Sequence, residues 1–565
     1  MNPRASELGN KVAYQIYIRS FQDSDGDGIG DLRGITSRLD YLADLGVDLL
    51  WITPFFPSPQ ADNGYDVTDY RAIDPRFGTM ADFEELAREA KAHGISLMLD
   101  MVFNHTSTTH EWFKRALTGE DRYLAYYKFV DAAPEATADN PGEPPTNWQS
   151  KFGGSAWEYV PQLNKWYLHL FDVTQADLDW DNPDVRDEMA SILRFWRKKG
   201  VDSFRFDVVN LISKVEGWQD DPTGGDGRQF YTDGPHVHEY LQELVERGGI
   251  DGCVTVGEMS STTLENCVRY TNPAHHELSQ AFSFHHLKAD YAGGDKWALQ
   301  PMDIDQLRTV FRSWQEGMQE QDGWNALFWS NHDQPRPNSR FGNTDTHWYA
   351  SSTLLPTCTH LMQGTPYIYQ GEELGMTNPD FTSIDQYRDV ESINYFQILQ
   401  DRGLTADEAF HVVHERSRDD ARTPMQWDGS ATAGFTTGTP WIGVSGNHTW
   451  INAAAELGDQ KSVYAYYQQL IALRKGEPII AEGEIRFFDG YEGTPIIAYE
   501  RTLENAPEGS AWRVVVLCNF SGDEQRLSAP FDQAETLVGN YGDALLEAGK
   551  LTLRPYEAVA LAWND

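Results

Sequence analysis

The stretch VRDEMASILRFWRKKGVDSFRFDVVN (residues 185–210) holds the pattern that decides the fold. Apolar residues at helical spacing in its first half predict an amphipathic helix, and Gly200 is the expected left-handed residue at the helix end. The apolar and aromatic run that follows is typical of a strand covered on both faces, as in a parallel sheet. The stretch therefore predicts one helix–strand unit of a parallel α/β fold.

The same unit recurs along the chain. Helices followed by strands are predicted at residues 31–56, 80–105 and 237–259, and further strands at 13–21, 281–284, 325–331 and 365–370. Eight strands that alternate with helices favour a closed (βα)8 TIM barrel over an open sheet.

The repeat of helix–strand units is interrupted after the third predicted strand. Gly94 and Gly200 lie much farther apart in the sequence than Gly46 and Gly94 do, and the excess begins after His105. It includes a Pro-, Asp- and Glu-rich stretch at 131–149, which predicts a loop. We expect this insertion to form a small subdomain over the mouth of the barrel.

The alternation of helices and strands changes again after a helix predicted at 462–476. Strand-like runs at 484–490, 495–502, 512–521 and 551–563 are separated by turns, which predicts a C-terminal antiparallel β-domain. The expected division of the chain is a barrel at 1–105 and 183–482, an inserted domain at 106–182 and a β-domain at 483–565.

The chain carries a strong negative charge. Lys and Arg number 45 against 86 Asp and Glu, for a formal net charge of −41. Such a surface repels polyanions, so nucleic acids and anionic membranes are poor candidate partners. An anionic substrate would need a local basic pocket to overcome this field.

Two features indicate where the protein works. No apolar stretch approaches the length of a membrane-spanning helix, and the first residues lack the apolar core of a secretory signal. Cys253, Cys267, Cys358 and Cys518 are scattered without metal-binding or redox spacing, and most lie in apolar runs typical of buried free thiols. These observations predict a cytoplasmic protein.

Three acidic residues end predicted strands: Asp207, Glu258 and Asp333. Carboxylates gathered at the mouth of one barrel are the groups that a glycosidase needs. Any one of them alone would be read as a solvated strand-end residue. Three with the same placement, two of them beside an Arg or a His, favour catalysis.

Four motifs carry a resemblance to the α-amylase family, glycoside hydrolase family 13. They are DMVFNH (100–105), FRFDVVN (204–210), VGEM (256–259) and SNHDQPR (330–336), in the family's order and on the expected strands. The resemblance implies that the insertion after strand three is that family's domain B. Within the family, DNGYD (62–66) and ARTPMQW (421–427) are similar to the oligo-1,6-glucosidase subgroup. GDGRQFYTDGP (225–235), SFHHLKADYAGGDKW (283–297) and YRDVES (387–392) resemble the members that hydrolyse trehalose 6-phosphate.

The resemblance implies a retaining double displacement. Asp207 would attack the anomeric carbon, and Glu258 would protonate the leaving oxygen and then activate water. Retention places the two carboxyl groups ~5–5.5 Å apart. Asp333 would hydrogen-bond the sugar hydroxyls and stabilise the transition state. Arg205 would keep the nucleophile ionised, and an ordinary salt bridge at that position is compatible with this role.

Further residues are implied to bind the sugar. His332 would lie beside Asp333, and His105 and Tyr65 resemble the family's glucose-binding histidine and aromatic platform. Asp62 and Arg422 would close the pocket around the non-reducing end, which makes the enzyme exo-acting. The full set of expected substrate-binding residues is Asp62, Tyr65, His105, Phe171, Arg205, Lys288, Lys296, His332 and Arg422, and for Phe171, as for Phe152, core packing is an equal alternative.

The loop at 23–32 predicts a structural calcium site. Asp23, Asp25, Asp27 and Asp31 alternate with small residues, and the Ile29 carbonyl would be a fifth ligand. Hard oxygen ligands at this spacing suit Ca²⁺, although Gly34 stands where a true EF-hand has Glu. The subgroup resemblance favours a metal over a plain acidic turn.

The substrate prediction depends on Lys288. In oligo-1,6-glucosidases this segment typically reads FEHMDLD, whereas here Lys288 replaces the acidic residue and Lys296 follows. Two ammonium groups would form the basic pocket that a phosphate dianion needs. The alternative is a lysine paired with Asp290 or Asp295.

The predicted function is that of a retaining exo-α-glucosidase that converts trehalose 6-phosphate to glucose and glucose 6-phosphate. The first alternative is an oligo-1,6-glucosidase acting on α-1,6-linked gluco-oligosaccharides, and the second is a transferase or isomerase on the same scaffold. The complete carboxylate set argues against a binding protein without activity.

Overall fold

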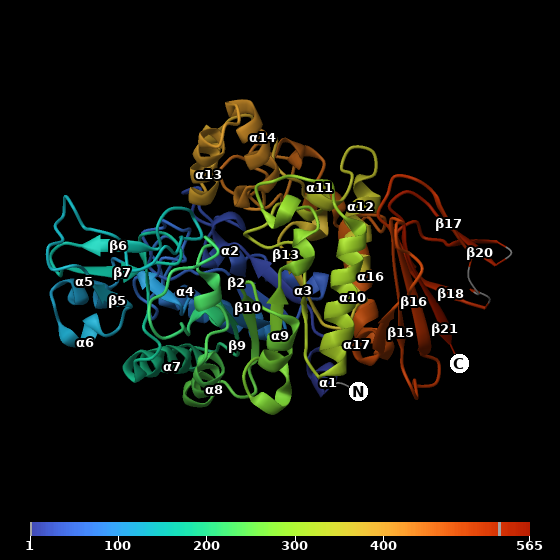
Figure 1. Cartoon of the computed structure of the whole chain (residues 1–565). Helices are drawn as coiled ribbons and strands as arrows, with labels where there is room; N and C mark the ends of the chain where they lie inside the picture. The colour runs from blue at the N-terminus through green and yellow to red at the C-terminus, as the bar shows by residue number, and fades with distance from the viewer. Residues whose placement is uncertain (1–2, 529–530, 532, 548, 565) are drawn as a thin grey trace.

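Eight parallel strands form the central barrel of the computed structural model, which describes residues 3–528, 531, 533–547 and 549–564 (Figure 1). The strands are β1 (Ala13–Ile16), β2 (Leu49–Ile52), β3 (Ser96–Met101), β9 (Ser203–Phe206), β10 (Val254–Met259), β11 (Gln280–Ser283), β12 (Ala326–Leu327) and β13 (Thr365–Tyr369). Their order in the sheet is β11-β10-β9-β3-β2-β1-β13-β12. A parallel bridge between Ala281 and Asn325 joins the two edge strands and closes the barrel. The predicted TIM barrel is confirmed.

Helices cover the outside of the barrel. They include α3 (Leu39–Leu45), α4 (Met80–Ala92), α7 (Pro183–Lys198), α8 (Val237–Gly248), α9 (Leu264–Thr271), α10 (Ile304–Glu320), α12 (Trp348–His360) and α16 (Val463–Gly476). In α7 the buried apolar face carries Met189, Leu193 and Trp196, whereas α12 is buried on all sides from Ala350 to His360. Gly200 follows α7 with φ 97°, the left-handed conformation predicted for it.

Two predicted elements differ from the structure. The single helix expected before β2 is divided into α2 (Leu32–Thr36) and α3, because the chain leaves helical geometry at Arg38. The seventh strand is only two residues long, since the carbonyl of Phe328 already accepts a hydrogen bond from His286 instead of joining the ladder. Asp333 therefore does not end a strand but lies in the turn that follows.

The inserted segment after β3 lies at one side of the barrel (Figure 1). Its elements are α5 (Glu111–Leu117), α6 (Asp121–Leu124), the antiparallel sheet β5 (Phe129–Asp131), β7 (Lys165–Leu168) and β6 (Trp157–Val160), and the pair β4 (His105–Ser107) with β8 (Gln175–Asp177). The Pro-rich stretch is irregular between β5 and residue 148, as predicted.

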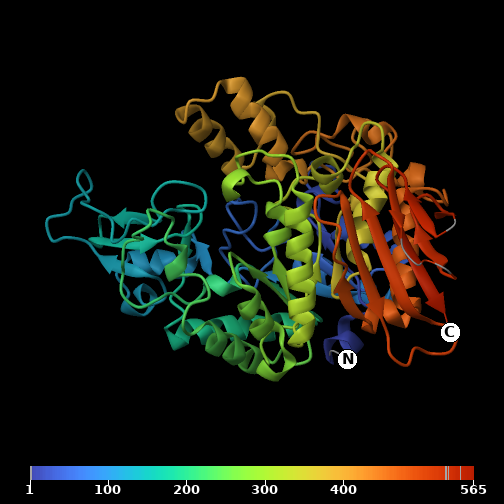
Figure 2. The same cartoon turned by 45° about the vertical axis from the view of Figure 1, so that its right-hand side comes forward.

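A second insertion, between β13 and α16, was not anticipated. It contains the helices α13 (Val390–Asp401) and α14 (Ala406–Arg416), which pack against each other at the top of the molecule in Figures 1 and 2. The amide of Asn394 on α13 reaches the carbonyl of Phe152 in the first insertion at 3.5 Å. The two insertions thus approach each other above the barrel mouth.

The C-terminal region is antiparallel, as predicted, but has more strands than expected. One sheet contains β14 (Glu484–Phe487), β15 (Ile496–Thr502), β16 (Ala511–Asn519), β21 (Ala558–Asn564) and β18 (Glu535–Gly539), and a second contains β17 (Gln525–Ser528), β20 (Lys550–Leu553) and β19 (Leu545–Glu547). The single strand predicted at 551–563 is split between the two sheets. Val514 and Val516 of β16 share a buried cluster with Leu354 of α12, so the sheet packs on the barrel. The predicted domain boundaries stay predictions.

Two further observations concern the expected setting. Within the described residues, no helix is long and apolar enough to cross a membrane. Cys253, Cys267, Cys358 and Cys518 are all buried and free of disulfides, as predicted for buried thiols.

Candidate active site

Arg205 organises the predicted catalytic carboxylates at the carboxyl ends of three adjacent strands. Its Nη1 lies 2.6 Å from Asp100 of β3 and 2.8 Å from Asp207, the residue after β9. Its Nη2 contacts Glu258 of β10. Asp207 and Glu258 therefore lie at the two arms of one guanidinium, which is buried to 1% exposure. The structure brings the predicted pair together.

Asp207 is held by its backbone as well as by Arg205. Its N–H donates to the carbonyl of Met101 at 3.0 Å and so extends the ladder with β3. The next residue, Val208, has φ 33°, which is rare for a β-branched side chain and turns the chain away from the barrel mouth. Burial raises the pKa of Asp207 well above its ordinary range; Arg205 opposes this shift, and Glu258 adds to it.

Asp333 has the opposite electrostatic environment. Its Oδ1 lies 2.6 Å from Arg422 and 3.4 Å from Arg418, and its Oδ2 lies 3.2 Å from Nε2 of His332. Burial alone would raise the pKa of Asp333, but His332, Arg418 and Arg422 hold it well below its ordinary range. Asp333 is thus held as an ionised carboxylate.

Asp62 forms an ion pair with Arg418, whereas the prediction placed Arg422 with Asp62 at the closed end of the pocket. Nη2 of Arg418 lies 3.1 Å from Asp62, and the same guanidinium contacts the buried Asp389. Arg422 lies one helical turn further on and binds Asp333 and the carbonyl of His332. Neither Arg418 nor Asp389 was predicted as a site residue, although Asp389 lies inside the motif YRDVES (387–392) and Arg418 shortly precedes ARTPMQW (421–427).

Aromatic and amide groups form the remaining wall. The Tyr65 ring stacks on His332 with centroids 5.1 Å apart, and its hydroxyl donates to Asp100 at 2.9 Å. His105 lies 3.1 Å from both the Tyr65 carbonyl and the amide of Gln175. Burial lowers the pKa of His105, so the ring is neutral at pH 7. Gln175, another residue missed from sequence, also reaches Asp62 at 3.1 Å.

These residues line a cavity of about 170 Å³, termed here the glucose pocket. Its lining comprises Asp62, Tyr65, His105, Phe152, Phe171, Asp207, Val208, Glu258, Lys296, Asp333, Gln334, Glu391 and Arg418. The predicted residues Arg205, His332 and Arg422 stand behind this lining and contact its carboxylates. Phe171 lines the pocket, 5.2 Å from the ring of His105, instead of only filling the core.

The two predicted phosphate-binding lysines have different surroundings. Nζ of Lys296 lies 2.6 Å from Glu391, so its charge is paired within the pocket wall. Lys288 is half-buried at the end of η5 (His285–Lys288), and in the described part of the chain it forms no salt bridge. Asp290, the alternative partner considered above, is held instead by Arg340 at 2.7 Å and Arg416 at 2.8 Å.

The predicted calcium loop gathers three of its four aspartates. Carboxylate oxygens of Asp23, Asp25 and Asp27 lie within 4.8 Å of one another. Asp31 has a different role, because its oxygens cap α2 at Gly34 N and accept from Ser24 N. Gly28 has φ 92°, and a Cβ there would lie 1.9 Å from the carbonyl oxygen of Thr439, so the loop requires glycine.

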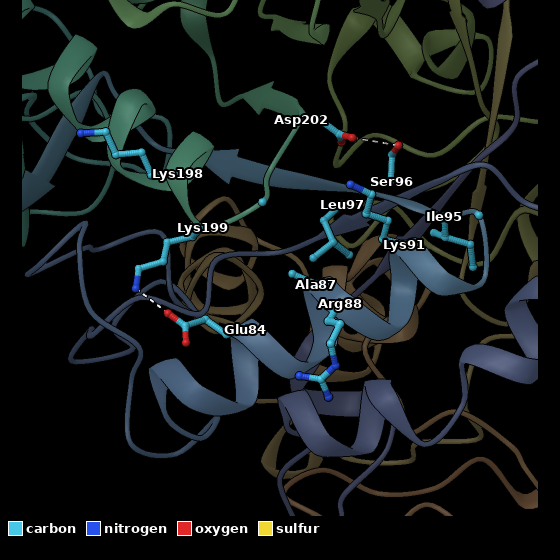
Figure 3. A pocket seen from close by; sticks show the side chains of 12 residues that line it. Glu84, Ala87, Arg88, Lys91, Ile95, Ser96, Leu97, Lys198, Lys199 and Asp202 are labelled. Atoms are coloured by element: carbon cyan, nitrogen blue, oxygen red, sulfur yellow. Dashed lines mark hydrogen bonds and ion pairs between the residues drawn. The ribbon is translucent and has the colours of Figure 1, made fainter.

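A larger hollow of about 530 Å³ lies at the opposite end of the barrel (Figure 3). It is lined by the C-terminal turns of α4 and α7 and by the residues that precede β3 and β9, including Arg88, Lys91 and Lys199. None of the predicted site residues lines it. Its lysines and arginine follow the common placement of cations at helix C-termini.

Comparison with known proteins agrees with this geometry. The alpha-amylase family model (alpha amylase, catalytic domain) matches residues 15–483. The chain belongs to the α-amylase family. It is 49% identical over 557 residues to a trehalose-6-phosphate hydrolase of Bacillus subtilis (strain 168), covering 97% of this chain and 96% of that protein. It is 50% identical over 554 residues to a trehalose-6-phosphate hydrolase of Escherichia coli (strain K12), covering 97% and 98%.

Two further similarities support the family assignment. An oligo-1,6-glucosidase of Parageobacillus thermoglucosidasius is 44% identical over 562 residues, covering 97% of each chain. A crystal structure of Bacillus licheniformis trehalose-6-phosphate hydrolase superposes with a TM-score of 0.91 at 46% identity, covering 99% of each chain. The chain is thus a family member with the whole length of these enzymes.

Proposed function

We propose that the protein is a retaining exo-acting α-glucosidase that hydrolyses trehalose 6-phosphate to glucose and glucose 6-phosphate. The observation that carries the substrate choice is the half-buried Lys288, which forms no salt bridge among the described residues and lies outside the lining of a glucose pocket whose own cations contact carboxylates. The pocket suits a neutral sugar, and Lys288 supplies a cation for a charged one. The similarity to trehalose-6-phosphate hydrolases over nearly the full chain supports the same choice.

The chemistry follows from the carboxylate pair. An oxygen of Asp207 attacks the anomeric carbon while Glu258 donates its proton to the bridging oxygen, so that glucose 6-phosphate leaves and a glucosyl ester forms. Glu258, now ionised, takes a proton from water, whose oxygen displaces Asp207 with a second inversion. Asp333, bound by Arg422 at 2.6 Å, is placed to accept hydrogen bonds from sugar hydroxyls.

The exo action follows from the Asp62–Arg418 pair. Both residues line the pocket and contact each other at 3.1 Å, a pair that would close its inner end. A cavity of about 170 Å³ has room for one glucose unit, so the chain end enters and one bond is cleaved per encounter. The unphosphorylated glucose of the substrate would occupy this pocket.

The competing function is that of an oligo-1,6-glucosidase, favoured by the 44% identity noted above. Trehalose 6-phosphate and isomaltose should be compared as substrates of the purified protein. We expect kcat/KM for trehalose 6-phosphate to exceed that for isomaltose by a large factor. Equal kcat/KM values for the two substrates, or a higher value for isomaltose, would indicate that the protein is an oligo-1,6-glucosidase instead.

Two remaining expectations are also proposals. Calcium would be held by Asp23, Asp25 and Asp27; burial raises the pKa of Asp27, and the charges of Asp25 and Asp23 add to this shift, which a divalent cation would relieve. The Ile29 carbonyl and Asp31 stay predicted ligands. The four free thiols support a reducing, cytoplasmic setting.

A further inference from the structure

A rigid loop places a second cation beside the barrel mouth. Asp221 accepts hydrogen bonds from Thr223 and from the N–H of Gly227, which closes the loop on itself. Gly227 has φ 83°, and a Cβ there would lie 2.4 Å from Trp148, so the loop packs tightly against the inserted segment. The next residue, Arg228, opens the short helix η3 (Arg228–Phe230), whose Phe230 stacks on Trp148 with centroids 5.7 Å apart.

One carboxylate joins this loop to the inserted segment. Asp226 lies 2.8 Å from Nε of Arg228 and 3.3 Å from Nζ of Lys151. Its backbone carbonyl also accepts from Gln149 at 3.3 Å. The carboxylate thus fixes two cations from two segments and neutralises one of their charges.

A third cation, Lys288, ends η5, which follows the strand β11 that pairs with β10 at Glu258. Burial lowers the pKa of Lys288, and the Arg228 guanidinium is the charged neighbour that lowers it further. Burial likewise lowers the pKa of Lys151, with Asp226 opposing and both Arg228 and Lys288 adding to the shift. Lys151 and Arg228 therefore share one carboxylate, and Lys288 adds a third positive charge, in a chain of net charge −41.

The group lies next to the glucose pocket. Lys151 directly precedes Phe152, which lines the pocket, and η5 with Lys288 follows β11, where Phe282 pairs with Glu258. The cations thus lie on the side of the glucose pocket where Glu258 would protonate the leaving group.

We propose that Lys151, Arg228 and Lys288, termed here the cation cluster, form the subsite for the phosphate of the substrate, and that Arg228 determines specificity together with Lys288. This inference rests on the proposed function and adds residues to it. A phosphate dianion would balance the excess charge of the cluster and accept the planar N–H fork of Arg228. Asp226 would hold Arg228 in place for this contact.

The test is the ratio of kcat/KM for trehalose 6-phosphate to kcat/KM for a neutral aryl α-glucoside. Arg228→Gln should lower this ratio by roughly 5- to 20-fold, since the side chain is half exposed and screened by solvent. Arg228→Lys keeps the charge and should restore much of the ratio. Arg88→Gln, which removes the same charge at the opposite barrel end shown in Figure 3, should leave the ratio unchanged.

A second measurement separates binding from turnover. Glucose 6-phosphate and glucose should be compared as inhibitors of aryl α-glucoside hydrolysis. In Arg228→Gln, the inhibition constant of glucose 6-phosphate should rise about 5-fold or more, and that of glucose should stay the same. A parallel rise of both constants would indicate a distorted pocket and overturn the phosphate role of Arg228.

The outcomes distinguish this inference from the function on which it rests. If the unmodified protein prefers isomaltose, the proposed function fails. If it prefers trehalose 6-phosphate and Arg228→Gln keeps the same ratio and the same inhibition by glucose 6-phosphate, only the role of Arg228 fails.

Discussion

The glucose pocket and the cation cluster handle charge in opposite ways. In the pocket, Arg205 contacts Asp100, Asp207 and Glu258, and Arg418 contacts Asp62 and Asp389, so each of these two cations is paired with at least two carboxylates. In the cluster, Lys151 and Arg228 share Asp226, and Lys288 adds a third positive charge. Paired charges orient hydroxyls without attracting an ion, whereas excess positive charge recruits a dianion. The difference assigns glucose to one region and phosphate to the other.

The largest effect is expected from breaking the pocket's chemistry. Asp207→Asn removes the nucleophile and should lower kcat for both charged and neutral substrates by about a thousandfold or more. Glu258→Gln should have a similar effect on trehalose 6-phosphate, whose sugar leaving group needs a proton. Steady-state kinetics with circular dichroism as a folding control measure this. Near-wild-type turnover by folded Asp207→Asn would refute the nucleophile assignment.

Changing the cluster should affect only the charged substrate. A charge-assisted hydrogen bond contributes about 1.5–3 kcal/mol, so Lys288→Ala should lower kcat/KM for trehalose 6-phosphate by roughly 10- to 150-fold. The aryl α-glucoside offers no phosphate, and its kcat/KM should change far less. Equal losses on both substrates, or none on either, would show that Lys288 does not bind phosphate.

The pH dependence of activity should also distinguish the glucose pocket from the cation cluster. Asp207 must be ionised to attack, and burial raises its pKa above the ordinary value of 3.8. Activity on the neutral aryl glucoside should therefore fall with decreasing pH already above the ordinary aspartate range. For trehalose 6-phosphate, protonation of the phosphate near pH ~6 should add a second decline, because a monoanion binds the cluster less well. Identical acid limbs for the two substrates would contradict this separation.

The smallest effect is expected at the calcium loop, which lies outside both regions. Chelation should lower Tm by a few degrees, as expected for loss of a ligand that stabilises only the folded state. The chemical step should be unaffected once the protein is folded. Asp27→Asn should abolish the response of Tm to calcium. A Tm that is insensitive to chelator and to added calcium would make the loop an acidic turn.

Sequence reasoning was accurate where pattern and local chemistry coincide. The helix–strand unit around Gly200 predicts β9 correctly because apolar periodicity reports burial directly. Residues whose role depends on contacts with distant parts of the chain were harder to predict from sequence. Arg418 meets Asp62 across 356 positions, and nothing in the local sequence distinguishes it from Arg422.

The cation cluster illustrates the same limit. Lys288 was predicted from its own motif, but Lys151 and Arg228 come from other segments and meet only in the folded chain. Lys296 was assigned the same role as Lys288, whereas its pairing with Glu391 depends on the unanticipated helix α13. Local sequence gives the residue types at a site, and the tertiary fold decides which charges remain unpaired.

The most direct test of this division is a crystal structure of the Asp207→Asn variant with trehalose 6-phosphate bound. The account predicts unphosphorylated glucose between Asp62 and Asp333, and phosphate oxygens ~2.7–2.9 Å from Lys288. Phosphate density inside the glucose pocket, or a phosphate directed into solvent away from Lys288, would contradict it.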